Sequence, residues 1–339
     1  QKPIFNWLDH RASGVLLHPT SLPGDYGIGT LNDHCQEFID FLSDAGFTYW
    51  QVCPLGPTGF GDSPYQSFSS FAGNPYLISL KAIADHGLLD PAILEDLSTL
   101  PKSIVDYGAL FNAKWPILNA IYNTYIKNSS IELPYGDFDD FCSQEASWLE
   151  PFAFFQALKS NFKGAPWRQW PAKYRDYEKA IKAPTPEKLV HEIEAQKFYQ
   201  YLFFGQWRRI RDHAASKGVR IIGDIPIFVA LDSADVWQNQ SYFQIDPKTS
   251  DPIAVAGCPP DYFSEDGQYW GNPLYDWQAH ENDSYSWWIE RLKASFKMHD
   301  VVRIDHFRGF DSYWSIPYGS ETAREGEWVD GPGTGFFKR

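Results

Sequence analysis

Four short runs of β-type residues, separated by helical stretches and long loops, constrain the fold of this chain more than any other feature. Between the first two runs, apolar residues from Leu31 to Ala45 recur at helical spacing, and Gly46 stands where that helix is expected to end. A strand, a helix and a second strand at this spacing predict a parallel βαβ unit. The four predicted strands are Ser13–Leu17, Thr48–Leu55, Val219–Val229 and Val301–Ile304.

The second half of the chain continues this alternation. A helix is predicted from Thr185 and Pro186, a capping residue followed by proline at the first helical position, to Gly218. An amphipathic helix near Tyr285–Met298 then leads into the fourth strand. We therefore expect an α/β protein, a TIM-type (β/α)8 barrel with helical insertions, of which this chain carries about the first four strands. A doubly wound open sheet is the alternative, disfavoured because no Gly-rich phosphate loop follows the first strand.

The chain divides into three predicted parts. Residues 1–80 are expected to hold the first barrel units and an active-site loop, Gly56–Gly73, which is rich in Gly, Ser, Pro and aromatic residues. Residues 81–186 are expected to form a helical insertion subdomain, broken by prolines. Residues 187–339 are expected to hold the third and fourth barrel units, with a turn-rich substrate-binding loop at Ala230–Trp277. Four strands cannot close an eight-stranded barrel, so we expect a longer protein, of which this piece alone would be unstable and inactive.

Charge, hydropathy and cysteine content exclude several classes of partner. A formal net charge of −14 without a Lys/Arg cluster would repel nucleic acid. No apolar run approaches the ~18 residues of a membrane span, so no membrane partner is expected. The start, Gln1–His10, lacks the features of a signal peptide, which predicts a cytoplasmic protein, or a plastid stromal one if a transit peptide was removed. We expect no metal and no cofactor, because the sequence offers no cluster that would need either. The four cysteines show no zinc-type spacing: Cys35, Cys53, Cys142 and Cys258.

Aromatic residues make up 17% of the chain and include 14 tryptophans. Flat rings pack against the C–H faces of sugars while neighbouring polar groups bond the hydroxyls, which suits a neutral carbohydrate ligand. Core filling is the alternative, and composition alone favours it.

Two aspartates, Asp224 and Asp305, lie at or near the ends of predicted strands, where a barrel would direct them into its mouth. For a lone strand-end aspartate, a structural salt bridge or a cap is the commoner role. Arg303 shares a strand face with Asp305, and its charge would keep Asp305 ionised as a nucleophile. Asp224 on the neighbouring strand could orient Arg303. His306 could bond a sugar hydroxyl or be an ordinary core or turn imidazole, and spacing alone does not decide between the two.

Several segments around these residues resemble those of a known family. The matching segments are Ser13–Val15, Gly61–Ser67, Gly223–Pro226, Gly257–Ser264, Gly267–Pro273 and Arg303–His306, with Asp106–Gly108 and Lys114–Trp115 in the helical part. Together they closely resemble the 4-α-glucanotransferases, also called amylomaltases or disproportionating enzymes. The resemblance runs along most of the chain.

The resemblance implies a TIM-like barrel and a retaining double displacement without a cofactor. Asp305 would attack the anomeric carbon of an α-1,4-glucan, and the 4-hydroxyl of an acceptor maltooligosaccharide would intercept the resulting glucosyl-enzyme. Arg303 would hold Asp305 ionised, and His306 would bond hydroxyls of the sugar before the scissile link. The predicted substrate-binding residues are Ser63, Tyr65, Tyr107, Asp224, Asp261, Gln268, Trp270 and His306.

A retaining mechanism also needs a second carboxylic acid, ~5 to 5.5 Å from the nucleophile. The family's glutamate for this role follows the fifth strand, which is expected beyond Arg339. The polar connection near the end of the chain holds three glutamates that do not match its motif, Glu321, Glu325 and Glu327. An α-glucan hydrolase of amylase type and a non-catalytic glucan-binding fragment remain as alternatives. Tyr65 and Trp270 could also be core rings, and Ser63 a turn residue.

Overall fold

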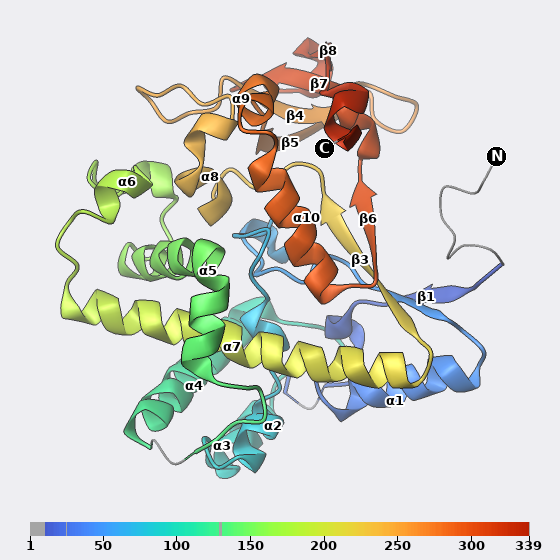
Figure 1. Ribbon diagram of the computed structural model, residues 1–339, viewed down its shortest axis with the longest axis vertical. Coiled ribbons are helices and arrows are strands. Elements are labelled where there is room, and N and C mark those ends of the chain that lie inside the picture. Colours follow the sequence, from blue (N-terminus) through green and yellow to red (C-terminus); the bar gives the residue numbers. More distant parts are fainter. Residues whose placement is uncertain (1–10, 25, 129–130, 339) are drawn as a thin grey trace.

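The computed structural model describes residues 11–24, 26–128 and 131–338, and only the backbone of Phe60. A parallel sheet lies in the middle of the molecule, an antiparallel sheet at one end and a group of helices at the other (Figure 1). The predicted α/β class is therefore confirmed. Gln1–His10, on which the expectation about a signal peptide rested, lies outside the described residues.

The parallel sheet consists of the four strands predicted from the sequence, in the order β1-β2-β3-β6. The first three are shorter than the predicted runs. In the pairing of β3 with β6, Asp224 lies opposite Arg303 and Pro226 lies opposite Asp305. The register therefore brings the two predicted aspartates to the same end of the sheet. The strands are β1 (Gly14–Leu16), β2 (Tyr49–Gln51), β3 (Arg220–Pro226) and β6 (Val301–Asp305).

Three long helices contact the strands of this sheet, and all three were predicted. Asn32 caps the first by accepting a hydrogen bond from the backbone N–H of His34. Pro186, not Thr185, directly precedes the second, and Gly218, with a φ of +73°, follows its end. Among the described helices, none is both long and apolar enough to cross a bilayer. The helices are α1 (Asp33–Asp44), α7 (Glu187–Ser216) and α10 (Ser286–Met298).

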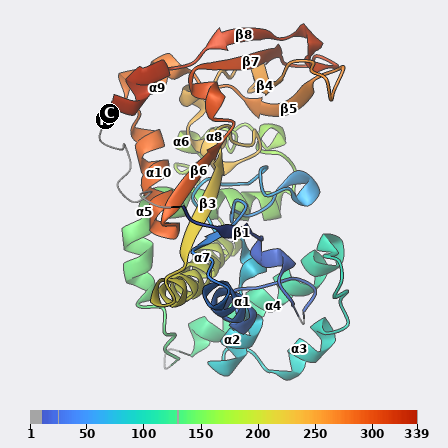
Figure 2. The same ribbon diagram turned by 90° about the vertical axis from the view of Figure 1, so that its right-hand side faces the viewer.

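The region between residues 80 and 180 is mainly helical and packs against α7 (Figures 1 and 2). Pro116 and Pro151 lie inside helices, contrary to the expectation that prolines interrupt the helices here. A proline inside a helix removes one backbone hydrogen bond, and packing of both helices on α7 offsets that loss. The helices are α2 (Leu80–Asp85), α3 (Ala92–Leu97), α4 (Tyr107–Lys127), α5 (Phe138–Asn161) and α6 (Tyr177–Ala180).

The antiparallel sheet was not predicted, and its order is β5-β4-β7-β8. Ala230–Trp277, expected to be a loop, contributes two of its strands and a short helix, α8 (Ala234–Gln238). Glu327, expected in a polar connection, lies in its last strand. The strands are short, and the central pair, β4 with β7, joins segments about 60 residues apart, so local periodicity does not reveal the sheet. They are β4 (Ala254–Cys258), β5 (Gln268–Pro273), β7 (Ser312–Pro317) and β8 (Glu327–Asp330), with helix α9 (Trp277–Asn282) after β5.

Many of the tryptophans fill the interior. Six of the tryptophans that the structure describes are almost completely buried, and they belong to two large hydrophobic clusters, one around α1, β2 and α7 and the other between α5, α10 and the antiparallel sheet. Core filling therefore accounts for these six rings, as composition alone favoured. They are Trp50, Trp167, Trp170, Trp207, Trp237 and Trp288.

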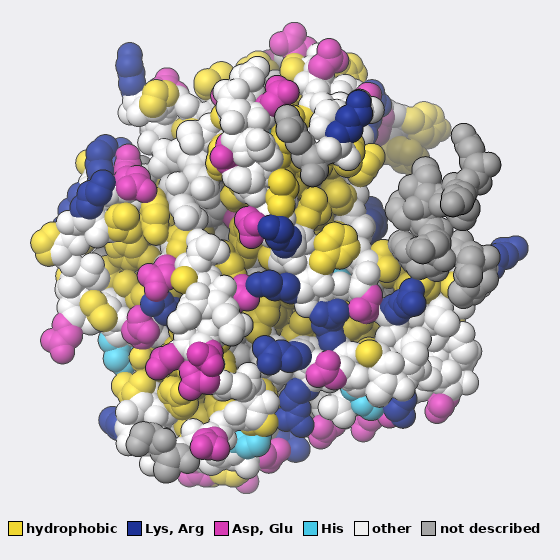
Figure 3. Space-filling model, in the orientation of Figure 1, with side chains coloured by type: hydrophobic (Ala, Val, Ile, Leu, Met, Phe, Trp, Pro, Cys, Tyr) yellow, Lys and Arg dark blue, Asp and Glu magenta, His cyan; other side chains and the backbone are white. Residues whose placement is uncertain are grey.

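Basic side chains line α10 and the end of α7 on the face shown in Figure 3. Three basic side chains of α7 and α10 form ion pairs with carboxylates: Lys293 with Glu290 at 2.8 Å, Lys297 with Glu145 at 2.6 Å and Arg211 with Asp300 at 3.0 Å. The positive charge of these three side chains is therefore neutralised locally.

Gly223 in β3 allows α10 and the segment after it to approach the sheet. A Cβ atom at Gly223 would lie 2.3 Å from the buried ring of His299. We predict that Gly223→Ala lowers the free energy of unfolding by about 1 to 3 kcal/mol through overpacking. Denaturant titration would measure the loss. Gly335→Ala is the matched control, because its Cβ would meet no atom within 4 Å; an equal effect of both changes would contradict the prediction.

Candidate active site

Arg303 joins the two predicted aspartates at the ends of β3 and β6. Its Nη2 donates to Oδ1 of Asp305 at 2.5 Å, and its Nη1 donates to Oδ2 of Asp224 at 2.6 Å. Arg303 and Asp305 lie two residues apart on one strand, so their side chains share a face, as predicted. One guanidinium thus holds two carboxylates, one from each strand.

The two carboxylates differ in exposure. The side chain of Asp224 is 2% exposed, whereas those of Asp305 and Arg303 are 39% and 46% exposed. Burial raises the pKa of Asp224, and the hydrogen bonds and charge of its partners oppose that rise. Partial desolvation disfavours the charged form of Arg303, but the two carboxylates outweigh it and raise its pKa. Asp224 is therefore a fixed, internal counter-ion, and Asp305 is the carboxylate that a ligand can reach.

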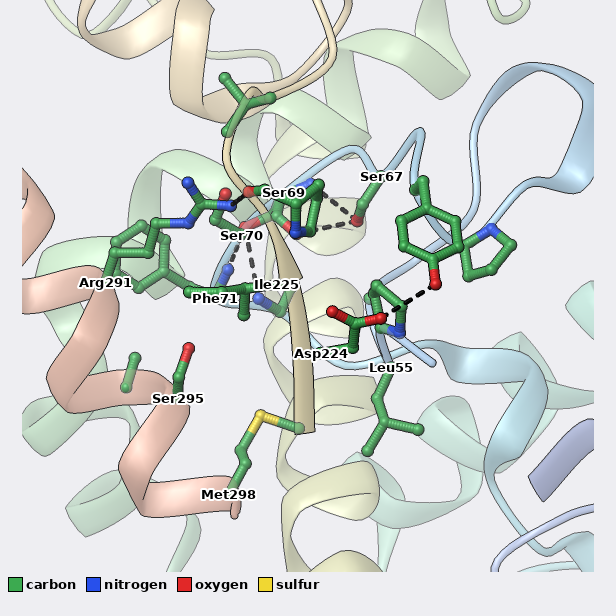
Figure 4. Close-up of a pocket in the computed structure, with 18 of the residues that line it drawn as sticks. Leu55, Ser67, Ser69, Ser70, Phe71, Asp224, Ile225, Arg291, Ser295 and Met298 are labelled. Carbon is green, nitrogen blue, oxygen red and sulfur yellow. Dashed lines mark hydrogen bonds between the residues drawn. The ribbon is translucent and has the colours of Figure 1, made fainter. Parts of the chain in front are cut away.

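Tyr65 brings the loop after β2 to the same group. Its hydroxyl donates to Oδ2 of Asp224 at 2.9 Å, and burial together with the Asp224 charge raises the pKa of Tyr65 (Figure 4 shows Asp224 beside β3). Tyr65 therefore contributes a hydrogen bond through its hydroxyl and does not merely fill the core. The Oγ of Ser63 accepts from the backbone N–H of Tyr65 at 3.3 Å, which is a turn contact within the loop.

His306 and Trp270 form a second group beside Asp305. The rings of Trp270 and His306 meet edge to face at 4.9 Å, and the indole N–H of Trp270 donates to Oε1 of Gln268 at 3.0 Å. His306 has a φ of +52°, a conformation that a residue with a side chain adopts at an energetic cost. Its Nε2 is buried and has no partner among the described residues. Burial lowers the pKa of His306, which favours a neutral ring with a nitrogen available to a ligand.

Sequence reasoning missed two polar residues at neighbouring strand ends. His18 follows β1, and burial lowers its pKa to about 4. Cys53 follows β2 and lies close enough to Tyr65, Asp224 and Arg303 to interact with them, and burial raises its pKa. A usable signal was present in the sequence. His18 comes just after a predicted strand, and Cys53 lies near the end of one, as Asp224 and Asp305 lie at or near the ends of theirs.

The structure does not bring Asp261 into contact with the Arg303 group. Oδ1 of Asp261 accepts from the backbone N–H groups of Phe263 and Ser264 at 2.9 and 2.8 Å, which closes a turn between β4 and β5. The adjacent rings of Tyr262 and Phe263 are 98% and 93% exposed and were not among the predicted site residues. This turn presents two aromatic faces to solvent.

Tyr107 also lies apart from the Arg303 group. It is the first residue of α4, and its ring packs edge to face on Tyr76 at 5.9 Å. Tyr76 lines a cavity of about 1070 Å³ between α4, α5, α7 and the loop after β2. Of the predicted residues, Tyr65, Asp224, Arg303 and Asp305 therefore form one connected group, with Trp270, Gln268 and His306 beside it.

A metal ion has no evident place in this group. Within residues 11–24, 26–128 and 131–338, no three or more His, Cys, Asp or Glu side chains converge in a way that could hold a metal.

Comparisons with known proteins identify the family. A family model described as 4-alpha-glucanotransferase matches residues 17–339. The 4-alpha-glucanotransferase of Thermus thermophilus is 49% identical over 329 residues, which is 97% of this chain and 65% of that protein. The chloroplastic/amyloplastic 4-alpha-glucanotransferase of Solanum tuberosum is 39% identical over 97% of this chain and 57% of that protein.

Solved structures agree with these matches. Amylomaltase from Streptococcus agalactiae in complex with acarbose superposes with a TM-score of 0.90 at 39% identity, over 97% of this chain and 66% of that one. Amylomaltase from Corynebacterium glutamicum, at 19% identity, shares the fold with a TM-score of 0.77, over 96% of this chain and 45% of that one. The chain thus spans between 45% and 66% of the length of these four relatives. The chain belongs to the 4-alpha-glucanotransferase family.

Proposed function

We propose that the protein containing this chain is a 4-α-glucanotransferase, which moves α-1,4-glucan segments between maltooligosaccharides and uses Asp305 as its nucleophile. The observation that carries the proposal is the Arg303 guanidinium bonded to both Asp305 and Asp224. It supports an ionised, oriented carboxylate at the exposed end of a parallel sheet, as a retaining mechanism requires. Membership of the family supplies the substrate class.

The proposed reaction has two displacements. In the first, a carboxylate oxygen of Asp305 bonds to the anomeric carbon while the bond from that carbon to the glycosidic oxygen breaks. A carboxylic acid in the remainder of the longer protein protonates the departing chain. In the second, the same group removes the proton from an acceptor 4-hydroxyl, which attacks the anomeric carbon and releases Asp305. Two inversions retain the α configuration.

The surrounding residues suit a neutral sugar. The unpartnered Nε2 of His306 could bond a hydroxyl of the sugar attacked by Asp305. Trp270, with Gln268 on its indole N–H, could supply an apolar face next to that hydroxyl. Tyr65 would act mainly through Asp224. Ser63, Tyr107 and Asp261 remain proposed substrate residues. Ser63 contacts the Arg303 group only through the backbone N–H of Tyr65, and contacts with that group give no support for the other two.

We also propose the finer architecture. The parallel order β1-β2-β3-β6 supports the first four strands of a TIM-type barrel, to be closed by the rest of the longer protein. The proposed parts are 1–80, 81–186 and 187–339, with an antiparallel sheet in the third part in place of a simple loop. The cytoplasm is the proposed location, or the plastid stroma in a plant.

Maltotriose separates the possible activities of the full-length protein. We predict that the protein converts maltotriose to glucose plus longer maltooligosaccharides, which chromatography would detect. Asp305→Asn should lower the rate of this conversion on the order of 10³-fold or more, because the amide cannot act as the nucleophile. Glucose and maltose without elongation would show a hydrolase instead. Unchanged substrate with measurable binding would show a glucan-binding protein, and a normal rate in Asp305→Asn would exclude Asp305 as nucleophile.

Tyr65→Phe tests whether the hydroxyl of Tyr65 stabilises the ionised form of Asp224. The change removes one of the two donors to Oδ2 of Asp224, so the pKa of Asp224, already raised by burial, should rise further. We predict a roughly tenfold lower transfer rate at neutral pH, as the loss of about 1.5 kcal/mol from a hydrogen bond to a charged group implies. The acidic limb of the pH–rate profile should move to higher pH, since Asp224 must be ionised to hold Arg303.

Tyr201→Phe is the matched control for Tyr65→Phe. It removes a phenol that donates to the backbone carbonyl of Gly136 at 2.6 Å, away from the Arg303 group. An unshifted acidic limb in Tyr65→Phe, or the same shift in Tyr201→Phe, would contradict the proposed role of Tyr65.

A further inference from the structure

A buried arginine lies behind the end of β3 and takes no part in the contacts described so far. Arg291, on α10, is 1% exposed, and its guanidinium lies 5.4 and 4.8 Å from the ring centres of Trp287 and Trp288. A fully buried arginine is costly unless its charge and donors are satisfied. Its hydrogen bonds therefore indicate which part of the fold it supports.

The donors of Arg291 point to the last carbonyls of β3 and the residue after it. Nη2 donates to the carbonyl oxygen of Pro226 at 2.5 Å, and Nη1 donates to that of Ile227 at 3.0 Å. The hydroxyl of Tyr275 donates to the same Ile227 oxygen at 2.7 Å and lies 3.3 Å from Nη1 of Arg291. Figure 4 shows Arg291 and Asp224 on opposite sides of β3. The arginine thus holds the strand end from the side away from Asp224.

The same strand end is bonded to the proposed nucleophile. The backbone N–H of Ile227 donates to the carbonyl oxygen of Asp305 at 3.3 Å, and Pro226 is opposite Asp305 in the register of β3 and β6. Asp224 lies two residues before Pro226 on the same strand. A displacement of Pro226 and Ile227 would therefore move both carboxylates that Arg303 bridges.

A buried counter-ion extends this network to the loop that carries Tyr65. Asp235, at the start of α8, is 4% exposed, and its charge interacts with that of Arg291. Oδ2 of Asp235 accepts from the backbone N–H of Ser70 at 2.7 Å, and Ser70 lies in the loop after β2. Arg291 thus bonds the end of β3 directly, and that end is bonded to β6 through the N–H of Ile227. Asp235 bonds the loop that carries Tyr65 through the N–H of Ser70.

We infer that Arg291 is a positioning residue for the glucosyl transfer proposed above: it sets the backbone at the end of β3 and thereby the placement of Asp224 and Asp305. This inference rests on the proposed function, because it concerns the reactivity of Asp305. The arginine fork is needed, since it reaches two carbonyls while stacking on two indole rings, whereas a lysine is a single point donor.

The test isolates the first displacement in the full-length protein. With α-maltotriosyl fluoride, Asp305 bonds to the anomeric carbon, the carbon–fluorine bond breaks, and fluoride leaves with the electron pair without needing a proton. Single-turnover fluoride release and mass spectrometry of the labelled protein then report the rate and the site of the reaction. The variants are Arg291→Lys and Arg291→Met.

Arg211→Met is the matched control. Arg211, on α7, donates to the backbone carbonyl of Lys297 and bonds Asp300 at 3.0 Å, so it supports the opposite, amino end of β6. Its loss should lower thermal stability while leaving the rate of Asp305 labelling within about twofold.

We expect Arg291→Met to slow labelling about 10- to 100-fold, as a small misplacement of reacting groups does. The concentration of fluoride substrate giving half-maximal rate should change less than threefold. Arg291→Lys should label faster than Arg291→Met but more slowly than the unmodified protein. If Arg291→Met does not fold, the labelling rate of Arg291→Lys tests the inference. A folded Arg291 variant that labels as fast as the unmodified protein would overturn the inference. Absence of labelling in the unmodified protein would instead contradict the proposed function.

Discussion

The parallel pairing of β3 with β6 determines where the charged groups of the candidate site lie. Its register places Asp224 opposite Arg303, and the pleat of β6 places Asp305 on the same face two residues later. A slip of one residue would turn the side chains of β6 to the other face and separate Arg303 from both carboxylates. The site is therefore a consequence of backbone pairing first and of side-chain chemistry second.

One of the three charged groups is internal, and the other two are partly exposed. Asp224 is internal, and its burial alone would favour the neutral acid. The donors of Arg303 and Tyr65 converge on one of its oxygens and favour the carboxylate. With Nη1 of Arg303 fixed on Asp224, Nη2 is directed to Asp305 near the surface. One carboxylate therefore orients the cation, and the other stays accessible to a substrate.

The sequence predicted what is local and missed what depends on distant partners. The strands that end near Asp224 and Asp305 follow from periodicity, and the contact of Arg303 with Asp305 follows from their spacing. The pairing of β4 with β7 was not predictable, because no local pattern links such short, distant strands. From its position in the sequence, Arg291 cannot be distinguished from an exposed basic residue on an amphipathic helix. Its burial depends on the carbonyl groups at the end of β3, which no feature of its own segment reveals.

The attraction between Arg303 and Asp305 depends on whether water or a ligand lies beside them. Two unit charges 4 Å apart attract by about 1 kcal/mol in water and by about 4 kcal/mol at an effective dielectric constant of 20. Because Arg303 and Asp305 are partly exposed, water weakens their attraction in the open site. If the proposed function holds, a sugar ring seated beside His306 and Trp270 would displace that water and strengthen the attraction between Arg303 and Asp305. The buried contacts of Asp224 and Arg291 change little in that event, so they can hold the strand ends in both states.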